Sequence, residues 1–71
     1  MTLYEGKTGC AYKVRELSME EGLMRRLQAL GLKEGTGVRV LNRTQKGAPV
    51  LYVRGTRRAV GKHTCAHIEV V

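Results

Sequence analysis

The chain has 71 residues and a net charge of +7, from 13 Lys and Arg against six Asp and Glu, and it contains neither Phe nor Trp. A chain this short has a thin apolar core, so residues 1–71 are expected to form a single domain without a deep catalytic cleft. No stretch approaches the ~20 apolar residues of a membrane span, the first residues lack a signal-peptide pattern, and two cysteines are too few for a disulfide scaffold, which together predict a cytoplasmic protein with reduced thiols.

The basic excess lies mainly in the second half of the chain. From Thr36 to Val71 seven basic residues face a single acid, Glu69, whereas residues 1–35 carry six basic and five acidic residues. Such asymmetry is typical of proteins that meet an anionic partner, which here would be an acidic protein surface, nucleic acid or anionic lipid. The alternative is that the charge only keeps a small domain soluble.

The first half of the chain predicts one strand followed by one helix. A strand is expected over Gly9–Leu17, because Cys10, Tyr12 and Val14 alternate there with Ala11, Lys13 and Arg15, as in a half-buried strand. Leu3 is expected to anchor the core. Ser18 is expected to cap a helix over Met19–Leu30, because Glu21 three residues later completes a capping box.

The expected helix has one apolar face. Its apolar side chains at helical spacing are Leu23, Met24, Leu27 and Leu30. Leu27 and Leu30 are expected to bury the helix on the sheet, and Gly31 is expected to end it in a left-handed conformation. Leu32 then packs back beneath the helix end, and Gly35 follows in a tight connection.

The second half of the chain predicts short strands only. They are expected at Val38–Val40, Val50–Val53, Arg57–Val60 and Ile68–Val71. Asn42–Ala48 is expected to form a hairpin loop, and Pro49 suits the start of an edge strand because proline cannot donate a ladder hydrogen bond. A run of short strands in so few residues favours a strongly bent sheet. We therefore expect a mainly β fold with one α-helix, a five-stranded SH3-like barrel in which the helix follows the first strand.

One segment is similar to a known family signature. In Met24–Gly35 a basic pair is followed by Leu27, then Leu-Gly-Leu at residues 30–32, then Gly35. Val38-Arg39-Val40, Pro49 with the strand after it, Gly55, and a tail from Ala59 to Val70 follow in the same order. From Leu3 to Val70 the chain resembles the FeoA family.

The resemblance implies a fold and a partner. FeoA proteins are small cytoplasmic SH3-like domains that accompany FeoB, a membrane-bound ferrous iron transporter with a cytoplasmic GTPase-like domain. The same fold occurs at the C-terminus of DtxR-type repressors. The resemblance thus implies an accessory or adaptor protein of ferrous iron uptake that binds FeoB at the inner face of the membrane, and it leaves oligomeric state open.

The side chains that could ligate a metal gather near the C-terminus. His63, Cys65 and His67 would share one face of a strand, or His63 and His67 would align on a helical turn. With Cys10 they would make a Cys and His set suited to zinc, and iron is the other candidate. The alternatives are a buried Cys65 that acts as a small apolar residue and histidines that are merely solvated.

No motif predicts catalysis, because the glycines form no phosphate-binding loop and the acids do not pair around a substrate. We expect a partner-binding surface instead, formed by the basic residues of the strands: Arg39, Arg43, Arg54, Arg57, Arg58 and Lys62. Nucleic-acid binding is the main alternative, although Tyr4, Tyr12 and Tyr52 are the only aromatic residues available for stacking on bases. A free-standing metal carrier is the second alternative.

Overall fold

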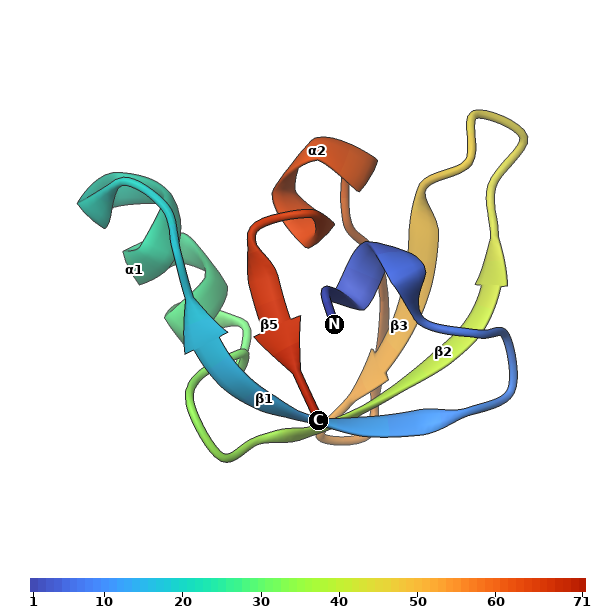
Figure 1. Cartoon of the computed structure of the whole chain (residues 1–71), viewed down its shortest axis with the longest axis horizontal. Coiled ribbons are helices and arrows are strands. Elements are labelled where there is room, and N and C mark those ends of the chain that lie inside the picture. The colour runs from blue at the N-terminus through green and yellow to red at the C-terminus, as the bar shows by residue number, and fades with distance from the viewer.

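The computed structural model describes residues 1–71, and five antiparallel strands form one strongly curved sheet in it (Figure 1). The elements are η1 (a 3-10 helix, Leu3–Glu5), β1 (Ala11–Leu17), α1 (Glu21–Ala29), β2 (Gly37–Arg43), β3 (Pro49–Val53), β4 (Thr56–Ala59), α2 (Lys62–Cys65) and β5 (Ile68–Val70). The strand order is β4-β3-β2-β1-β5. The expected mainly β fold, with its main helix after the first strand, is confirmed. No helix has the length and apolar character needed to cross a membrane.

The alternation of side chains along the strands builds the core. Twelve buried residues form one cluster, namely Leu3, Val14, Leu27, Leu32, Val38, Val40, Leu51, Val53, Val60, Cys65, Ile68 and Val70. Leu3 is fully buried, as expected, and η1 carries it into the core. The sheet bends at two irregularities in its ladders, one in β1 between Val14 and Glu16 and one in β2 between Val40 and Asn42. Such bulges sharpen the local twist and curl a small sheet around its core.

The start of α1 differs from the sequence prediction. Ser18 does not cap the helix; the cap position is Glu20, which makes no side-chain capping bond, and the helix begins at Glu21. The reason is a contact far along the chain, because the Ser18 N–H donates to the His67 carbonyl at 2.9 Å. Met19 also packs against the core, so the chain turns into the helix only after both residues are placed.

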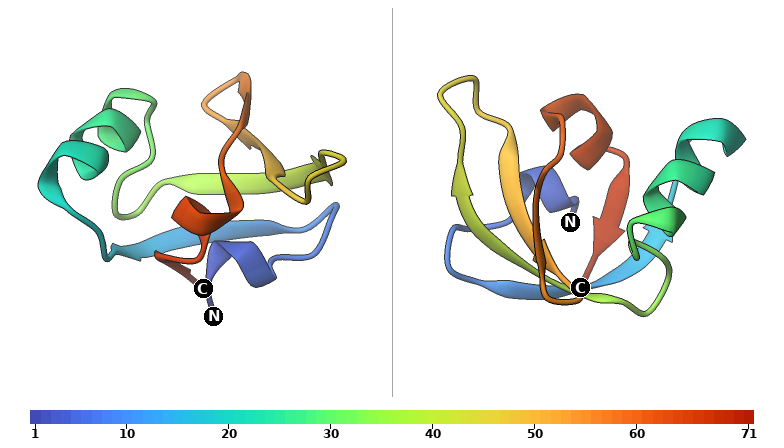
Figure 2. Two further views of the ribbon diagram at one scale, coloured as in Figure 1. Left: turned by 90° about the horizontal axis from the view of Figure 1, so that it is seen from above. Right: turned by 180° about the vertical axis from the view of Figure 1, so that it is seen from behind.

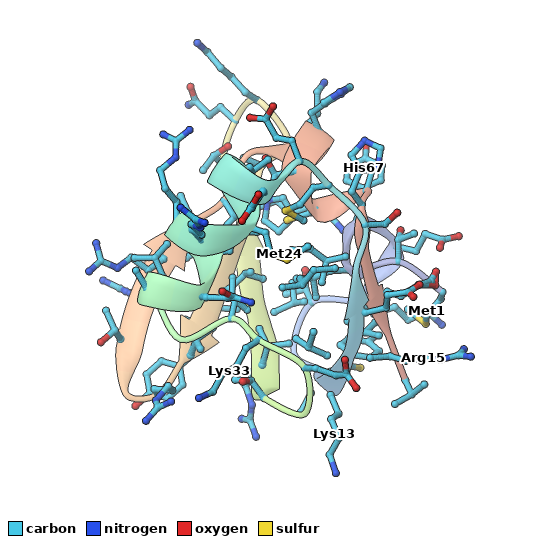
Figure 3. The ribbon with its side chains drawn as sticks, turned by 90° about the vertical axis from the view of Figure 1, so that its left-hand side faces the viewer. Met1, Lys13, Arg15, Met24, Lys33 and His67 are labelled. Atoms are coloured by element: carbon cyan, nitrogen blue, oxygen red, sulfur yellow. The ribbon has the colours of Figure 1, made fainter.

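The end of α1 is as expected, except for Leu30. Gly31 has φ +97°, and the Leu32 N–H donates to the Leu27 carbonyl at 2.9 Å, which satisfies one of the last helical carbonyls. Leu32 is buried, as predicted, but Leu30 is 38% exposed. The prediction that Leu30 buries the helix is wrong, because α1 rests on the sheet through Leu27 and half-buried neighbours such as Met24, which points from the helix toward the sheet in Figure 3.

One strand takes another position than predicted. β3 lies between β2 and β4, so Pro49 does not start an edge strand. It is tolerated because it is the first residue of the strand and is buried. The edges are β4 and β5, and the chain ends meet beside β5, where the Val70 N–H donates to the Met1 carbonyl at 2.9 Å (Figure 2).

Candidate functional site

The register of the sheet places three exposed side chains in one row across its outer face. Arg39 on β2 is opposite Tyr52 on β3, and Tyr52 is opposite Arg57 on β4. The residues on either side of Arg39 and of Tyr52 are buried, so these side chains point outward. Directly opposed residues have their Cβ atoms about 4.5–5.5 Å apart. The exposed Tyr52 is therefore flanked by an arginine on each neighbouring strand.

Beside this row the outer face has a shallow depression of about 360 Å³. Its lining residues are Ala11, Tyr12, Gly37, Val38, Arg39, Tyr52, Arg54 and Gly55. Small residues make up part of the lining, two of the side chains are arginines, and none is acidic. The depression therefore offers apolar contact and positive charge together.

The β3–β4 hairpin fixes Arg54 at the rim of this depression. Val53 is opposite Thr56, so Arg54 and Gly55 form a two-residue turn, and both have positive φ, 51° and 81°. A Cβ on Gly31 would lie 2.5 Å from Cδ of Arg54, so the aliphatic part of Arg54 lies on the bare backbone at the end of α1. The position suits a cation, since the C-terminus of a helix carries partial negative charge.

Lys13 is a further basic residue of the outer face that the predicted surface omitted. It is opposite Gly37 on β2, next to the pair of Ala11 and Arg39. Figure 3 shows Lys13 pointing away from β1 into solvent. The alternation of β1 carries the signal for this placement, because Lys13 is two residues from Ala11 and adjacent to the buried Val14.

The structure separates Arg58 and Lys62 from the row. Arg58 is opposite Leu51, whose side chain is in the core, so Arg58 emerges on the other side of the sheet from Arg57. Both residues are exposed because β4 lies at the edge of the sheet. Lys62 is exposed at the start of α2.

Arg43 is used inside the fold. Its guanidinium donates to the carbonyls of Tyr4 at 2.6 Å, Gly6 at 3.0 Å and Gly47 at 3.3 Å, and it lies 5.2 Å from the centre of the Tyr4 ring. These bonds join the end of β2 to η1 and to the β2–β3 loop. The Arg43 guanidinium therefore holds parts of the fold together, a role that the sequence-based expectation of a partner-binding residue did not include.

The candidate metal ligands do not converge. His63 and His67 lie one helical turn apart, and their ring centres are 5.5 Å from each other in an edge-to-face arrangement. Cys65 is fully buried with its Sγ 3.7 Å from the Val60 carbonyl, and burial raises the pKa of its thiol to about 11. Cys10 is exposed at the start of β1, and no three His, Cys, Asp or Glu side chains are grouped to hold an ion.

Comparison with known proteins identifies the family. The sequence matches the FeoA domain over residues 1–71. The chain belongs to the FeoA family. Its Leu-Gly-Leu signature is therefore the α1 terminus just described, where Gly31 supplies the positive φ and Leu32 enters the core. No curated protein sequence matches this FeoA chain.

Solved structures place the fold among FeoA proteins. FeoA from Chlorobium tepidum is 28% identical with a TM-score of 0.92, and the match covers 99% of this chain and 68% of that one. FeoA from Stenotrophomonas maltophilia, complexed with zinc and described as a procaryotic SH3 domain protein, is 25% identical with a TM-score of 0.83, over 100% and 89% of the two chains. A manganese-dependent transcriptional repressor shares the fold at 20% identity and a TM-score of 0.89, and there the match spans 40% of the repressor.

Proposed function

We propose that this FeoA-family chain is a non-catalytic accessory protein of ferrous iron uptake that acts in the cytoplasm, at the inner face of the membrane. Its outer sheet face docks on an acidic surface of the cytoplasmic part of FeoB. The row of Arg39, Tyr52 and Arg57 carries this proposal, because it joins two exposed guanidinium groups and an aromatic ring beside a depression without acids. Arginine pairs with carboxylates through two parallel hydrogen bonds, and arginine and tyrosine are enriched at protein interfaces.

The acids of the chain support a role in binding over a role in catalysis. Glu5 accepts from the Thr2 N–H at 2.7 Å, Glu21 pairs with Arg25 at 2.6 Å on α1, and Glu69 lies 3.6 Å from the terminal ammonium of Met1. These three acids are engaged within the fold, and none of the six acids lines the depression. Glu16 and Glu34 line a separate depression of about 160 Å³, which has no histidine, cysteine or lysine in its lining. A general acid or base needs a partner and a substrate within hydrogen-bond reach.

A binding measurement with the soluble cytoplasmic domain of FeoB tests the docking surface. The variant Arg39→Glu with Arg57→Glu should bind about tenfold or more weakly, since an exposed charge pair contributes up to about 1 kcal/mol and reversal turns attraction into repulsion at two positions. The control Lys7→Glu with Lys46→Glu changes the net charge equally at two exposed loop positions. Equal losses in both variants would mean that only net charge matters and would refute a localised surface.

The proposed docking does not require a bound metal. His63 and His67 can offer two imidazoles on an exposed helical turn, which would take up zinc or ferrous ion weakly, whereas the buried Cys65 cannot complete the set. Elemental analysis of protein purified without a histidine tag should find metal below one equivalent. A stoichiometric metal that is lost in a folded Cys65→Ser variant would instead make the chain a metal carrier.

One observation favours nucleic acid as a second candidate partner. Tyr52 is 47% exposed between Arg39 and Arg57, which is an arrangement that can stack a base and contact its phosphates. Anisotropy titrations with labelled single-stranded DNA and RNA would decide. Binding that weakens steeply with salt and is lost in Tyr52→Ala would support this candidate.

A further inference from the structure

The sheet has one uncovered edge. At the β5 edge the N-terminal segment adds a further bridge, because Thr2 is opposite Glu69 and the Val70 N–H donates to the Met1 carbonyl at 2.9 Å. At the other edge, β4 pairs with β3 alone, and all four of its residues are exposed. In Figure 2 the chain of β4 returns beside β3 and then leads into α2. An uncovered edge strand offers main-chain donors and acceptors to another chain.

The hairpin register shows which main-chain groups are free. In an antiparallel pair the residues alternate between bonding each other and pointing away. The two-residue turn makes Val53 and Thr56 a bonded pair. The Val60 N–H donates to the Pro49 carbonyl at 3.0 Å, so every second residue from Thr56 to Val60 bonds β3. The N–H and C=O groups of Arg57 and Ala59 therefore point outward, and no side chain or other element bonds them.

The charges beside this edge select its partner. Arg57 and Arg58 emerge on opposite faces of the sheet, and neither β4 nor its turn contains an acid. A second copy of β4 added to this edge would bring arginines close to arginines, and like charges on adjacent strands are destabilising. Basic edge strands prevent such self-pairing. The same charges attract a strand that carries acidic side chains on both faces.

An apolar groove continues from the end of β4. It has a volume of about 250 Å³ between α1 and the segment after β4, and its lining is apolar at Leu23, Leu27, Leu30, Ala59 and Val60 and polar at Arg26 and Thr64. Leu30 is exposed there although α1 ends beside it. The groove therefore offers apolar contact to a chain that runs along β4, next to the main-chain groups of Ala59.

We propose that an acidic, extended segment of the partner adds to β4 as an antiparallel sixth strand. Its main chain bonds Arg57 and Ala59, two adjacent acids meet Arg57 and Arg58 on opposite faces, and a neighbouring apolar side chain enters the groove beside Leu30. This is recognition by strand addition, in which main-chain bonds give affinity and side chains give specificity. The inference rests on the proposed docking to FeoB, for which it names the mode and the chemistry of the segment.

Amide hydrogen exchange measured by NMR tests strand addition without the transporter. The probe is a short capped peptide with the sequence Leu-Glu-Glu in a frame of valine and threonine, and its control has lysine in place of glutamate. At saturation the glutamate peptide should slow exchange of the Arg57 and Ala59 amides by about tenfold or more, as new main-chain bonds do. Unchanged exchange, equal protection by both peptides, or protection that rises with protein concentration alone would overturn the proposal, the last because it would identify self-pairing.

A proline substitution tests the same mode on the transporter domain. Ala59→Pro removes one outward N–H and obstructs an added strand, but keeps every charge and the bonds to β3. Binding should weaken by about tenfold, whereas Ala59→Thr should bind like the unmodified chain. Thermal unfolding and NMR spectra establish that both variants are folded.

These outcomes separate the two proposals. If Ala59→Pro binds normally while the Arg39 and Arg57 reversal has lost binding, then strand addition is overturned and docking through the outer face stands. If the FeoB domain fails to bind but the glutamate peptide protects Arg57 and Ala59, then strand addition stands and FeoB is the wrong partner.

Discussion

Replacing Gly31 by alanine should destabilise the chain through two separable causes. Gly31 has φ +97°, a conformation that costs an L-residue about 1–2 kcal/mol. The added Cβ would also lie 2.5 Å from Cδ of Arg54. The arginine can swing away, so this contact adds about 1 kcal/mol at most, the order of a strained rotamer. We therefore expect a total loss of about 1–3 kcal/mol.

That loss is large for this chain. A domain of 71 residues has a free energy of unfolding of about 4–11 kcal/mol, at about 0.05–0.15 kcal/mol per residue. At about 4–8 °C per kcal/mol for a domain of this size, the midpoint of thermal unfolding should fall by about 4–24 °C. Circular dichroism follows the transition in the absence of tryptophan.

Two further glycines separate the causes. Gly35 has φ +89° with no atom within 4 Å of an added Cβ, so Gly35→Ala should show the conformational cost alone. Gly22, inside α1, lacks the positive φ, and Gly22→Ala should stabilise the chain by about 0.5 kcal/mol. In an Arg54→Ala background, the further loss caused by Gly31→Ala should fall to that of Gly35→Ala. Equal effects of Gly31→Ala and Gly35→Ala would refute the contact with Arg54, and no effect in either would refute the whole reasoning.

Three other predictions follow from contacts and burial inside the fold. Arg43→Lys should lower the free energy of unfolding, measured in urea, by about 2 kcal/mol, because an ammonium group cannot bond three carbonyls in the geometry of a guanidinium. An unchanged urea midpoint would mean that these bonds do not stabilise the fold. Burial raises the pKa of Cys65 from 9.0 to about 11, so the unfolded chain ionises first as pH rises. The contribution of the neutral Cys65 thiol to the free energy of unfolding should be complete below pH 9.0 and be lost as the pH rises towards about 11. The free energy of unfolding of Cys65→Ala should lack this dependence on pH. A thiol reagent should modify the exposed Cys10 rapidly and Cys65 only on unfolding, and rapid modification of both would contradict the burial of Cys65.

The sequence predicted those parts of the fold that depend on near neighbours. Alternation placed the strand ends within two residues, apart from the end of β2, which was expected at Val40 and lies at Arg43. The glycine after α1 marked the end of the helix, because this signal is also local. Ser18 failed as a cap because its N–H is taken by His67, from a segment that no local pattern connects to it. Leu30 failed because helical spacing identifies an apolar face but cannot say how far that face rests on the sheet.

The sequence indicated which basic residues could form the candidate site but not which of them share a face of the sheet. The basic excess after Thr36 indicated a charged surface, yet the register decides that Arg57 shares a face with Tyr52 and Arg58 does not. The role of Arg43 left no trace in the sequence, since the carbonyls of Tyr4 and Gly6 can be supplied by any residue type. Only the fold brings those carbonyls to the guanidinium.

The shallow seating of α1 has a consequence for how this chain fluctuates. Leu27 is the one fully enclosed side chain of the helix, whereas every strand except β4 contributes at least one residue to the apolar cluster. Amides of α1 should therefore exchange through brief local detachment, while those of β2 and β3 await global opening. Detachment would take Leu27 out of the apolar cluster, so a ligand that binds the underside of α1 would have to offer Leu27 an apolar surface in its place.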